Sequence, residues 1–377
     1  MSIRLAGITI RSRPVARAGR IRPRRALRPA RSVAGSNERS PTMTRSPLID
    51  LAFGYMPAQM LHVAAELGLA DALHGEPRSS AELAKETGAH APSLLRLLRA
   101  LAVLGVVEQR ERDLFALTAE GARLRSDAPD SIRSLIRLFC GPDVWRTWGD
   151  MAETLRTGEY AWLRVTGKTP FEFFDTNEEL SVTFNRAMAE HTRDVAPALI
   201  GAHDFRRHRT VADLGGGDGT LIAAILRAAP GARGILYDLP AGLAAAPKTL
   251  RDLADRCDIV PGDFFESVPE GADAYVLKSV LHDWDDEKAA TILRTCRAAM
   301  RPDARVLVLE QIVPEMVAPD TMGTLMNDLN MLVSTGGRER TEEEFRALLA
   351  DAGFGVVAIT GPAAPSNYHV IEARPAA

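Results

Sequence analysis

The first regular hydrophobic pattern in the chain extends from Leu48 to Leu73. Apolar residues recur there at helical spacing, Pro57 interrupts the run, and charged residues are few. The spacing predicts one or two helices. Because such helices would expose apolar surface to water, we expect this segment to pack against a partner.

Between residues 79 and 117 the pattern changes to short helices followed by short β runs. Ser79-Ser80 is typical of a helix start, and Gly88 of a helix end. The predicted elements are a helix at 81–86, a second helix at 92–104, and a hairpin of residues 106–108 and 114–117. This order is that of a winged-helix domain, which we expect over residues 46–130. The second helix is mostly apolar, which favours packing or dimerisation over DNA contact.

Residues 131–200 are predicted to be helical and are rich in aromatic side chains. These aromatics are Phe139, Trp145, Trp148, Tyr160, Trp162, Phe171, Phe173, Phe174 and Phe184. Each could belong to a hydrophobic core, and as a group they could also line a pocket for a flat substrate. We expect this segment to be a helical connector that lines the substrate pocket.

Residues 201–377 alternate short β runs with helical segments. The β runs are residues 211–214, 234–238, 258–260, 274–277 and 305–310, and two more at 356–359 and 368–371 close the chain without a helix between them. Alternation of this kind predicts an α/β domain, a doubly wound parallel sheet with ligands at the carboxyl ends of its strands. The last two runs are expected to form a terminal hairpin.

Composition narrows the class of protein. A length of 377 residues with 46% hydrophobic residues indicates two domains, or one large domain with an appendage. Three cysteines without a CxxC pair make a disulfide framework or a zinc cluster improbable and fit a reducing cytoplasm. No run approaches the roughly 18 apolar residues that a membrane span needs. We therefore expect a soluble, cytoplasmic protein without a membrane partner.

The charge is unevenly distributed. Residues 1–45 contain twelve arginines and one acid, Glu38, which gives this segment a net charge of +11. Because the whole chain has a net charge of −3, the remaining 332 residues have a net charge of −14. An acidic body argues against nucleic acid as the main ligand. The tail is expected to be disordered. It could be a nucleic-acid arm, a transit peptide or a segment without function, and the last is favoured because Met43 could serve as a start codon.

The loop after the first strand of the α/β domain carries a glycine motif. Gly215, Gly217 and Gly219 follow Asp213 in the order D-x-G-x-G-x-G, whereas a dinucleotide GxGxxG motif would need glycine at Thr220. This order resembles motif I of the class I S-adenosylmethionine-dependent methyltransferases. The resemblance implies that the glycines let the backbone approach the methionine part of that cofactor.

Acidic residues also follow the next two strands. Asp238 ends the second strand, where a carboxylate can accept hydrogen bonds from both ribose hydroxyls. Asp263 follows the third strand and can accept from the adenine amino group, while Phe264 packs on the ring. We therefore expect S-adenosyl-L-methionine as the cofactor. Its expected contacts are Asp213, Gly215, Gly217, Asp238, Leu239, Asp263, Phe264 and Lys278.

The segment after the fourth strand is the most specific in the chain. Residues 281–286 read L-H-D-W-D-D. They resemble the L-H-D-W-x-D signature of the plant caffeate and flavonoid O-methyltransferases and their bacterial relatives that act on natural products. The resemblance implies that His282 is the general base that takes a phenolic proton. It also implies that two acids hold His282, and these align with Glu310 and Glu339.

The resemblance covers residues 48–374 and includes the acceptor pocket. A helix similar to the family's F-N-x-x-M helix makes Met188 a candidate wall of that pocket, and Met331 and Asp283 are the other expected acceptor contacts. A core role is open for both methionines. The plant enzymes carry a longer M-L-x-x-N-P-G-G loop, and residues 331–337 are one residue shorter here. The substrate-facing wall is therefore expected to differ from theirs.

The expected chemistry explains these residue types. An unperturbed phenol has a pKa of about 10 and histidine about 6.5, so neutral His282 removes the proton only because the phenolate is consumed by an adjacent sulfonium methyl. A paired carboxylate offsets the imidazolium charge and fixes the ring tautomer. No metal is required, and no acidic triad or histidine-rich set predicts one. We expect an S-adenosylmethionine-dependent O-methyltransferase that works as a homodimer on a small hydroxylated aromatic secondary metabolite.

Two alternatives remain at this point. The same cofactor and fold could serve N-methylation or a reaction without methyl transfer, although His282 with both glutamates favours O-methylation. A winged-helix regulator that senses a metabolite would use the basic tail and the N-terminal domain on DNA. The apolar second helix argues against that regulator.

Overall fold

The computed structural model describes residues 46–376, so the expected basic tail lies outside the described residues. The chain divides between Gln59 and Met60 into two compact units. The limits expected for the domains, 46–130, 131–200 and 201–377, stay predictions. None of the described helices is both long and apolar enough to cross a membrane.

The described part of the first unit contains α1 (Pro47–Ala52) and the start of α2 (Tyr55–Glu66). Residues 47–72 form three helices, α1, α2 and α3 (Leu69–Ala72), where one or two were expected, and Pro57 lies in the first turn of α2. Proline is tolerated there, since an N–H at that position would have no partner within the helix. The exposed fractions of Leu48 and Leu51 are 75% and 62%. These side chains agree with a segment that packs on a partner.

The winged-helix elements form at the start of the second unit. They are α3 (Leu69–Ala72), α4 (Ser80–Thr87), α5 (Ala91–Val103), β1 (Val107–Glu111) and β2 (Leu114–Leu117). Ser79 and Glu82 make a capping box at the start of α4, and Gly88 ends it in the left-handed conformation. Leu98 and Leu101 of α5 are fully buried in the local core. The predicted order of helix, helix and hairpin is confirmed.

A series of helices follows, as predicted. After a 3-10 turn at Gly121–Leu124 come α6 (Arg133–Phe139), α7 (Pro142–Gly149), α8 (Met151–Thr157), α9 (Ala161–Thr166), α10 (Pro170–Asp175) and α11 (Glu178–Ala202). Several aromatics pack on one another here. Trp162 makes edge contacts with Phe173 and Phe174, whose ring centroids lie 5.7 and 5.8 Å away. Much of the aromatic content therefore forms a core.

The central sheet has seven strands in the order β5-β4-β3-β6-β7-β9-β8. The strands are β3 (Thr210–Leu214), β4 (Arg233–Asp238), β5 (Cys257–Pro261), β6 (Ala274–Lys278), β7 (Arg305–Gln311), β8 (Phe354–Thr360) and β9 (Tyr368–Pro375). β3 to β7 are parallel, whereas β9 is antiparallel to both β7 and β8. The doubly wound sheet and the terminal hairpin are both confirmed.

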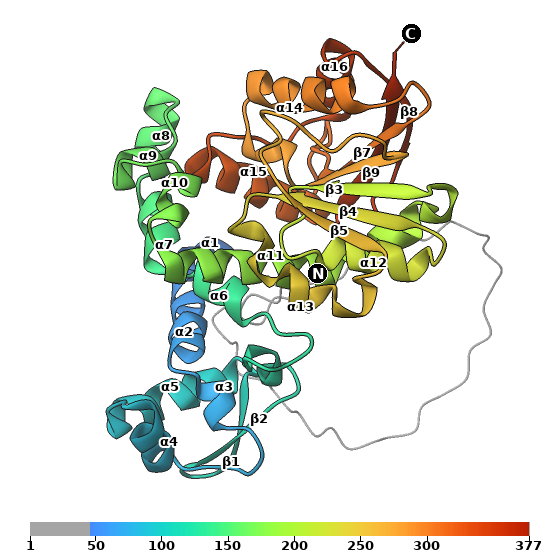
Figure 1. Cartoon of the computed structure of the whole chain (residues 1–377). Coiled ribbons are helices and arrows are strands. Elements are labelled where there is room, and N and C mark those ends of the chain that lie inside the picture. Colours follow the sequence, from blue (N-terminus) through green and yellow to red (C-terminus); the bar gives the residue numbers. More distant parts are fainter. Residues whose placement is uncertain (1–45, 377) are drawn as a thin grey trace, which may run out of the picture. The chain divides into compact units, whose positions relative to one another are not determined.

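Helices cover both faces of this sheet (Figure 1). The remaining helices and turns are η2 (Phe205–Arg207), α12 (Thr220–Ala228), η3 (Gly242–Ala245), α13 (Ala246–Thr249), η4 (Arg251–Leu253), η5 (Leu281–Asp283), α14 (Asp286–Ala299), η6 (Pro319–Thr321), α15 (Met322–Ser334) and α16 (Glu342–Asp351). Val211 packs in one core cluster with α11 and α12, while its neighbour Ala212 packs in another with α14 and α16. Neighbouring residues of a strand point to opposite faces, so both faces are buried.

Candidate active site

The carboxyl ends of the parallel strands bring the expected cofactor contacts to one edge of the sheet. Gly215 and Gly217, in the loop after β3, have φ values of 66° and 59°. Other residues rarely adopt this conformation. A Cβ added to Gly217 would meet no heavy atom within 4 Å. The loop therefore leaves open space beside its backbone.

Asp213 lies in β3, two residues before Gly215, and one oxygen of its carboxylate lacks a hydrogen-bond partner. Its side chain is buried, and Oδ2 has no hydrogen-bond partner. Burial raises the pKa of Asp213 to about 7, and the nearby Lys278 opposes that rise. A buried oxygen without a partner is costly. Asp213 is thus suited to accept a hydrogen bond from a donor group of a bound ligand.

Asp238 lies at the end of β4 and faces the same loop. Its Oδ2 accepts the N–H of Gly217 at 2.7 Å, and its Oδ1 accepts the N–H of Leu239 at 2.6 Å. Burial raises the pKa of Asp238, while the two backbone hydrogen bonds lower it. A carboxylate has about four acceptor positions. Asp238 therefore keeps capacity for two hydroxyl groups of a ribose.

Asp263 and Phe264 follow β5. Oδ1 of Asp263 accepts the N–H of Phe265 at 2.8 Å, which fixes the turn. A Cβ added to Gly215 would lie 3.5 Å from Cε1 of Phe264. The structure thus brings the Phe264 ring to the glycine loop, as expected for an aromatic face beside a bound base.

Lys278 ends β6 and is half-buried. Nζ donates to Oγ of Ser279 at 3.2 Å. Burial lowers the pKa of Lys278, while Glu310, Asp213 and Asp283 raise it by their negative charge. The residue therefore places a positive charge between the glycine loop and the turn that carries His282.

The side chain of Glu310 on β7 fixes the turn that carries His282 by accepting backbone hydrogen bonds. Oε1 of Glu310 accepts the backbone N–H groups of Val280, Leu281 and His282 at 3.0, 3.0 and 3.4 Å. Gly337 permits a second close approach, because a Cβ there would lie 2.0 Å from the carbonyl oxygen of His282. The His282 backbone is therefore held by two segments distant in sequence.

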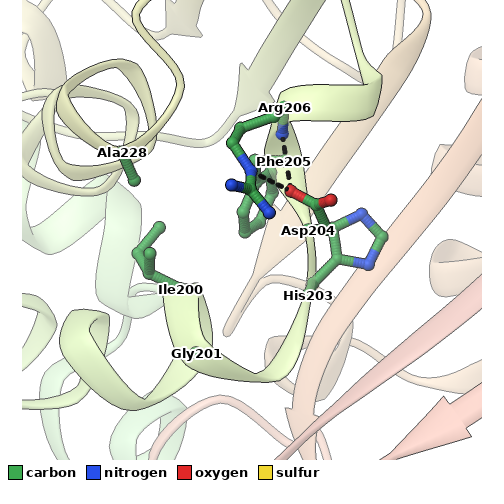
Figure 2. A pocket seen from close by; sticks show the side chains of 7 residues that line it. All are labelled: Ile200, Gly201, His203, Asp204, Phe205, Arg206 and Ala228. Atoms are coloured by element: carbon green, nitrogen blue, oxygen red, sulfur yellow. Dashed lines mark hydrogen bonds and ion pairs between the residues drawn. The ribbon is translucent and has the colours of Figure 1, made fainter.

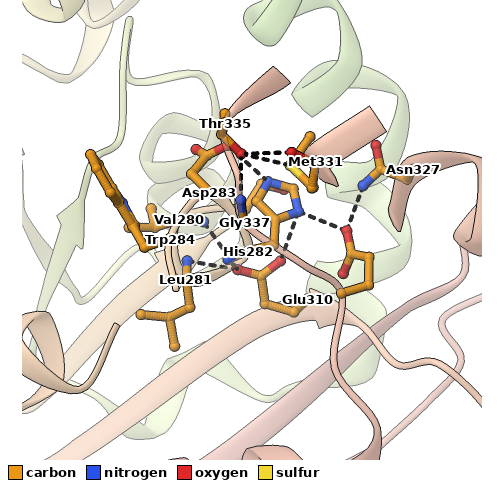
Figure 3. A network of polar contacts seen from close by, with 12 residues as sticks. Val280, Leu281, His282, Asp283, Trp284, Glu310, Asn327, Met331, Thr335 and Gly337 are labelled. Carbon is orange, nitrogen blue, oxygen red and sulfur yellow. Dashed lines mark hydrogen bonds and ion pairs between the residues drawn. The ribbon is translucent and has the colours of Figure 1, made fainter. Parts of the chain in front are cut away.

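The His282 ring faces Glu310 (Figure 3), and it also contacts Glu339. Nδ1 lies 2.7 Å from Oε1 of Glu339 and 3.5 Å from Oε2 of Glu310. Both glutamates and the imidazole are buried. A carboxylate at Nδ1 selects the tautomer in which that nitrogen carries the proton. Nε2, which lies 3.9 Å from Oδ1 of Asp283, is then free to accept a proton.

The charges of this cluster shift its proton affinities. Burial lowers the pKa of His282, but Glu310 and Glu339 outweigh burial and raise it to about 10. Burial raises the pKa of Asp283 to about 6, and that of Glu310 is also raised by burial. The buried carboxylates thus stabilise an imidazolium at His282.

The same cluster could also be considered as a metal site. Among residues 46–376, the possible ligand atoms of His282, Glu310 and Glu339 lie within 4.8 Å of one another. The 2.7 Å separation of Nδ1 and Oε1 is that of a hydrogen bond. A cation would have to displace the Nδ1 proton and widen this separation. The contacts therefore fit a proton better than a metal.

Two of the expected acceptor contacts lie on helices, Met331 on α15 and Met188 on α11. Met331 of α15 is buried, and its sulfur lies 3.9 Å from Oγ1 of Thr335. Met188 lies half-buried on α11. Trp284, two residues after His282, stacks on Phe171 of α10 with ring centroids 5.4 Å apart. The aromatic helices thus reach the turn that carries His282.

Sequence reasoning assigned no role to several residues that support this site. Arg340 is fully buried and donates to the carbonyl oxygens of Leu281 and Trp284 at 2.9 Å each. Its position beside Glu339 in G-G-R-E-R-T was the available signal. By contrast, no sequence pattern indicated Asn327, which donates to Glu339.

A chain of side-chain hydrogen bonds was also missed. Ser279 has a φ of 54°, the one positive value among the described residues other than glycine. Its Oγ lies 2.6 Å from the hydroxyl of Tyr368, which lies 3.1 Å from Nε2 of His191. These contacts connect β6, β9 and α11, which are far apart in sequence, so a local pattern could not reveal them.

A separate pocket of about 290 Å³ lies at the opposite end of β3 (Figure 2). It is lined by Ile200, Gly201, His203, Asp204, Phe205, Arg206 and Ala228. Its charged side chains pair with each other, since Nε of Arg206 donates to Oδ1 of Asp204 at 2.7 Å. None of the expected site residues lines this pocket.

Comparisons with known proteins agree with the geometry. The O-methyltransferase domain matches residues 148–355, and the O-methyltransferase dimerisation domain matches residues 49–126. The chain is 42% identical over 332 residues to a phenazine O-methyltransferase of Lysobacter antibioticus, covering 88% of this chain and 96% of the relative. It is 38% identical to 8-amino-8-demethylriboflavin N,N-dimethyltransferase of Streptomyces davaonensis, covering 84% and 91%.

Solved structures show the same fold. Human N-acetylserotonin methyltransferase in complex with SAM matches with a TM-score of 0.80 and 30% identity, over 88% of this chain and 97% of that chain. The cofactor is therefore S-adenosylmethionine, and the orphaned Asp213 oxygen and the open space at Gly217 fit such a ligand. The chain belongs to the S-adenosylmethionine-dependent O-methyltransferases with a dimerisation domain, which act on small secondary metabolites.

Proposed function

We propose that this enzyme methylates a phenolic or related hydroxyl of a small aromatic or polyketide-type metabolite, with His282 as the general base. The observation that carries the proposal is the contact of 2.7 Å between Nδ1 of His282 and Oε1 of Glu339. It leaves Nε2 as a proton acceptor at the end of β6, close to the glycine loop. A base must be within hydrogen-bond reach of the proton that it takes.

In the proposed reaction the acceptor oxygen loses its proton to His282 and gains a methyl group from the cofactor. His282 takes the phenolic proton at Nε2 and becomes an imidazolium. A bound cofactor would supply a methyl group on a positively charged sulfur, and the acceptor oxygen would take that methyl group as the S–C bond breaks. The proton on Nε2 then leaves to solvent when the product is released.

The pKa of His282 suits this proton transfer. An unperturbed phenol has a pKa of about 10. Glu310 and Glu339 raise the pKa of His282 against the opposing effect of burial, to about 10. Raising the pKa of His282 toward that of a phenol lowers the free-energy cost of the transfer. Two neighbouring carboxylates supply the negative charge that an imidazolium needs in a buried site.

The cofactor contacts proposed from the strand ends each have a distinct task. Gly215 and Gly217 let the ligand approach the backbone, and Asp213 offers its unpaired Oδ2. Asp238, with Leu239 beside it, would accept the ribose hydroxyls. Asp263 and Phe264 would contact the adenine, and Lys278 the carboxylate end of the cofactor.

The acceptor is proposed to lie against the aromatic side chains of the helices α6 to α11, residues 133–202. The stack of Phe171 on Trp284 borders the turn of His282. Met188, Met331 and Asp283 are the proposed direct contacts. We also propose a homodimer, formed through the apolar helices within the matched dimerisation domain. Cys257 and Cys296 are buried thiols, in keeping with our proposal of a reducing cytoplasm.

One relative supports a second candidate, transfer to nitrogen. The riboflavin-type relative is named an N,N-dimethyltransferase at 38% identity. An aromatic amine has a free lone pair and needs no base before it attacks a methyl group. The two functions therefore differ in how strongly they depend on His282.

The test is a screen of phenols, hydroxyquinones and aromatic amines with labelled S-adenosylmethionine. His282→Ala should lower the turnover of phenols by about 10²- to 10⁴-fold, because it removes the base. His74→Ala is the matched control, since His74 is exposed and distant in sequence from the site. Methylation of amines alone, with no loss in His282→Ala, would replace the hydroxyl proposal by the second candidate.

A further inference from the structure

Asn327 of α15 contacts the same oxygen that holds His282. Its Nδ2 donates to Oε1 of Glu339 at 2.5 Å, and Nδ1 of His282 donates to that oxygen at 2.7 Å. Figure 3 labels Asn327 and His282, the two donors. One carboxylate oxygen therefore serves two donors from different elements.

The orientation of the Glu339 carboxylate depends on these two donors. Its other oxygen, Oε2, is buried and has no hydrogen-bond partner. The backbone N–H of Glu339 donates to Oδ1 of Asp328 at 2.9 Å, which fixes the main chain but leaves the side-chain torsions free. The Asn327 donor is thus the contact, apart from His282 itself, that selects which oxygen faces the imidazole.

The helix that carries Asn327 is anchored on both sides of it. Oγ1 of Thr324 donates to Oε1 of Gln311 on β7 at 2.7 Å. Nε1 of Trp148 on α7 donates to Oδ1 of Asn330 at 3.2 Å. Because both neighbouring turns are tied to other elements, the Asn327 amide is presented from a rigid support.

We propose that Asn327 is a positioning residue that orients Glu339 and, through it, keeps His282 in the tautomer whose Nε2 faces the acceptor. The inference rests on the proposed role of His282 as the base. A neutral amide suits this task, because it donates to the carboxylate without adding a charge. An aspartate at this position would place a second carboxylate against Glu339.

Other charged groups surround the same imidazole. Glu310 comes from β7, Asp283 from the η5 turn and Lys278 from β6. His191 of α11 is also within electrostatic reach, and burial lowers its pKa to about 3, so it stays neutral. These groups are unchanged in a variant of Asn327, so a change in the His282 ring can be assigned to Glu339.

The direct test replaces Asn327 by Leu, Asp and Gln in the full chain. Asn327→Leu should lower kcat for a phenol by about 10- to 100-fold, the usual loss when a group supporting an active-site side chain is removed. The KM for S-adenosylmethionine should stay unchanged. Asn327→Asp should lose at least as much, and Asn327→Gln should recover part of the activity because it retains an amide donor.

Nuclear magnetic resonance of histidines labelled with ¹⁵N gives a readout independent of turnover. In the unaltered enzyme, at a pH above the one at which the ring titrates, the signals of His282, assigned with His282→Ala, should report a proton on Nδ1 alone. In Asn327→Leu the proportion of that tautomer should fall, and the pH at which the ring titrates should move. A merely structural role would leave both unchanged.

The matched control is Asn367→Leu. Nδ2 of Asn367 donates to Thr324 on the same helix at 3.4 Å, without touching Glu339. This variant should keep its kcat and its His282 signals. The inference is overturned if Asn327→Leu, folded as judged by its Tm, keeps both the kcat and the His282 signals of the unaltered enzyme.

The two proposals fail in different ways. If His282→Ala retains turnover while Asn327→Leu still shifts the His282 ring, the proposed base is wrong and the positioning of the ring stands. If His282→Ala abolishes turnover and Asn327→Leu changes nothing, the base stands and the inference about Asn327 falls.

Discussion

Replacing Glu339 by Gln should change the pH dependence of the reaction. His282 must be neutral to accept a proton, so activity rises as pH increases through its pKa. The elevation from about 6.5 to about 10 corresponds to about 5 kcal/mol of preference for the imidazolium. Glu310 and Glu339 produce this preference against the opposing effect of burial. The account therefore predicts an acid limb well above pH 6.5 in the unaltered enzyme.

The size of the Glu339 contribution follows from its distance. Two unit charges 4 Å apart interact by about 4 kcal/mol at an effective dielectric constant of 20. Gln removes that charge and keeps the shape, while Glu310 retains its own. The acid limb should therefore move down by roughly one to three pH units, and the maximal rate should fall because the base is weaker.

The assay measures kcat/KM from pH 6 to 10.5 with labelled S-adenosylmethionine and one phenol of high pKa. Glu342→Gln is the matched control, because Glu342 is an exposed acid that pairs with Arg346. It should leave the limb in place. An acid limb at the same pH in Glu339→Gln and the unaltered enzyme would refute the reasoning.

Three further predictions concern the cofactor, the assembly and the metal. Asp238→Ala should weaken S-adenosylmethionine binding by about 1 to 3 kcal/mol in calorimetry through lost hydrogen bonds, and an unchanged affinity would remove Asp238 from the site. Light scattering should report a dimer. The variant Leu51→Glu should shift the protein toward monomer, because a charge would enter an apolar contact. A dimer that persists in this variant would point to another interface. Turnover should survive dialysis against a chelator, because Nδ1 of His282 is hydrogen-bonded to Glu339 and not to a metal. Loss of turnover that a divalent cation restores would contradict this prediction.

Much of the fold was predictable because its signals are local. The short apolar β runs and the helical segments between them predicted the parallel strands, and two runs without a helix between them predicted the terminal hairpin. Ser79 and Gly88 marked the ends of α4, since capping depends on residues a few positions apart. The number of helices between Leu48 and Leu73 was less predictable, and Pro57 did not mark a boundary, because proline is accepted in the first turn of a helix.

The site was predictable only where it carries a motif. Short motifs and the family resemblance placed His282, Glu310 and Glu339 together, and the structure brings them within contact. Asn327 and Tyr368 carry no such motif. Their contacts arise from how α15 and β9 pack beside the central strands, which depends on the whole fold.

The dependence of the His282→Ala loss on the acceptor is the most direct test of the central claim. Turnover of the unaltered enzyme and of His282→Ala is measured at one pH on phenols of the same shape and different pKa. If His282 takes the proton, the loss should be about 10²- to 10⁴-fold for phenols of high pKa and should shrink for those that arrive ionised. An equal loss across the series, or near-normal turnover of a high-pKa phenol, would contradict the account.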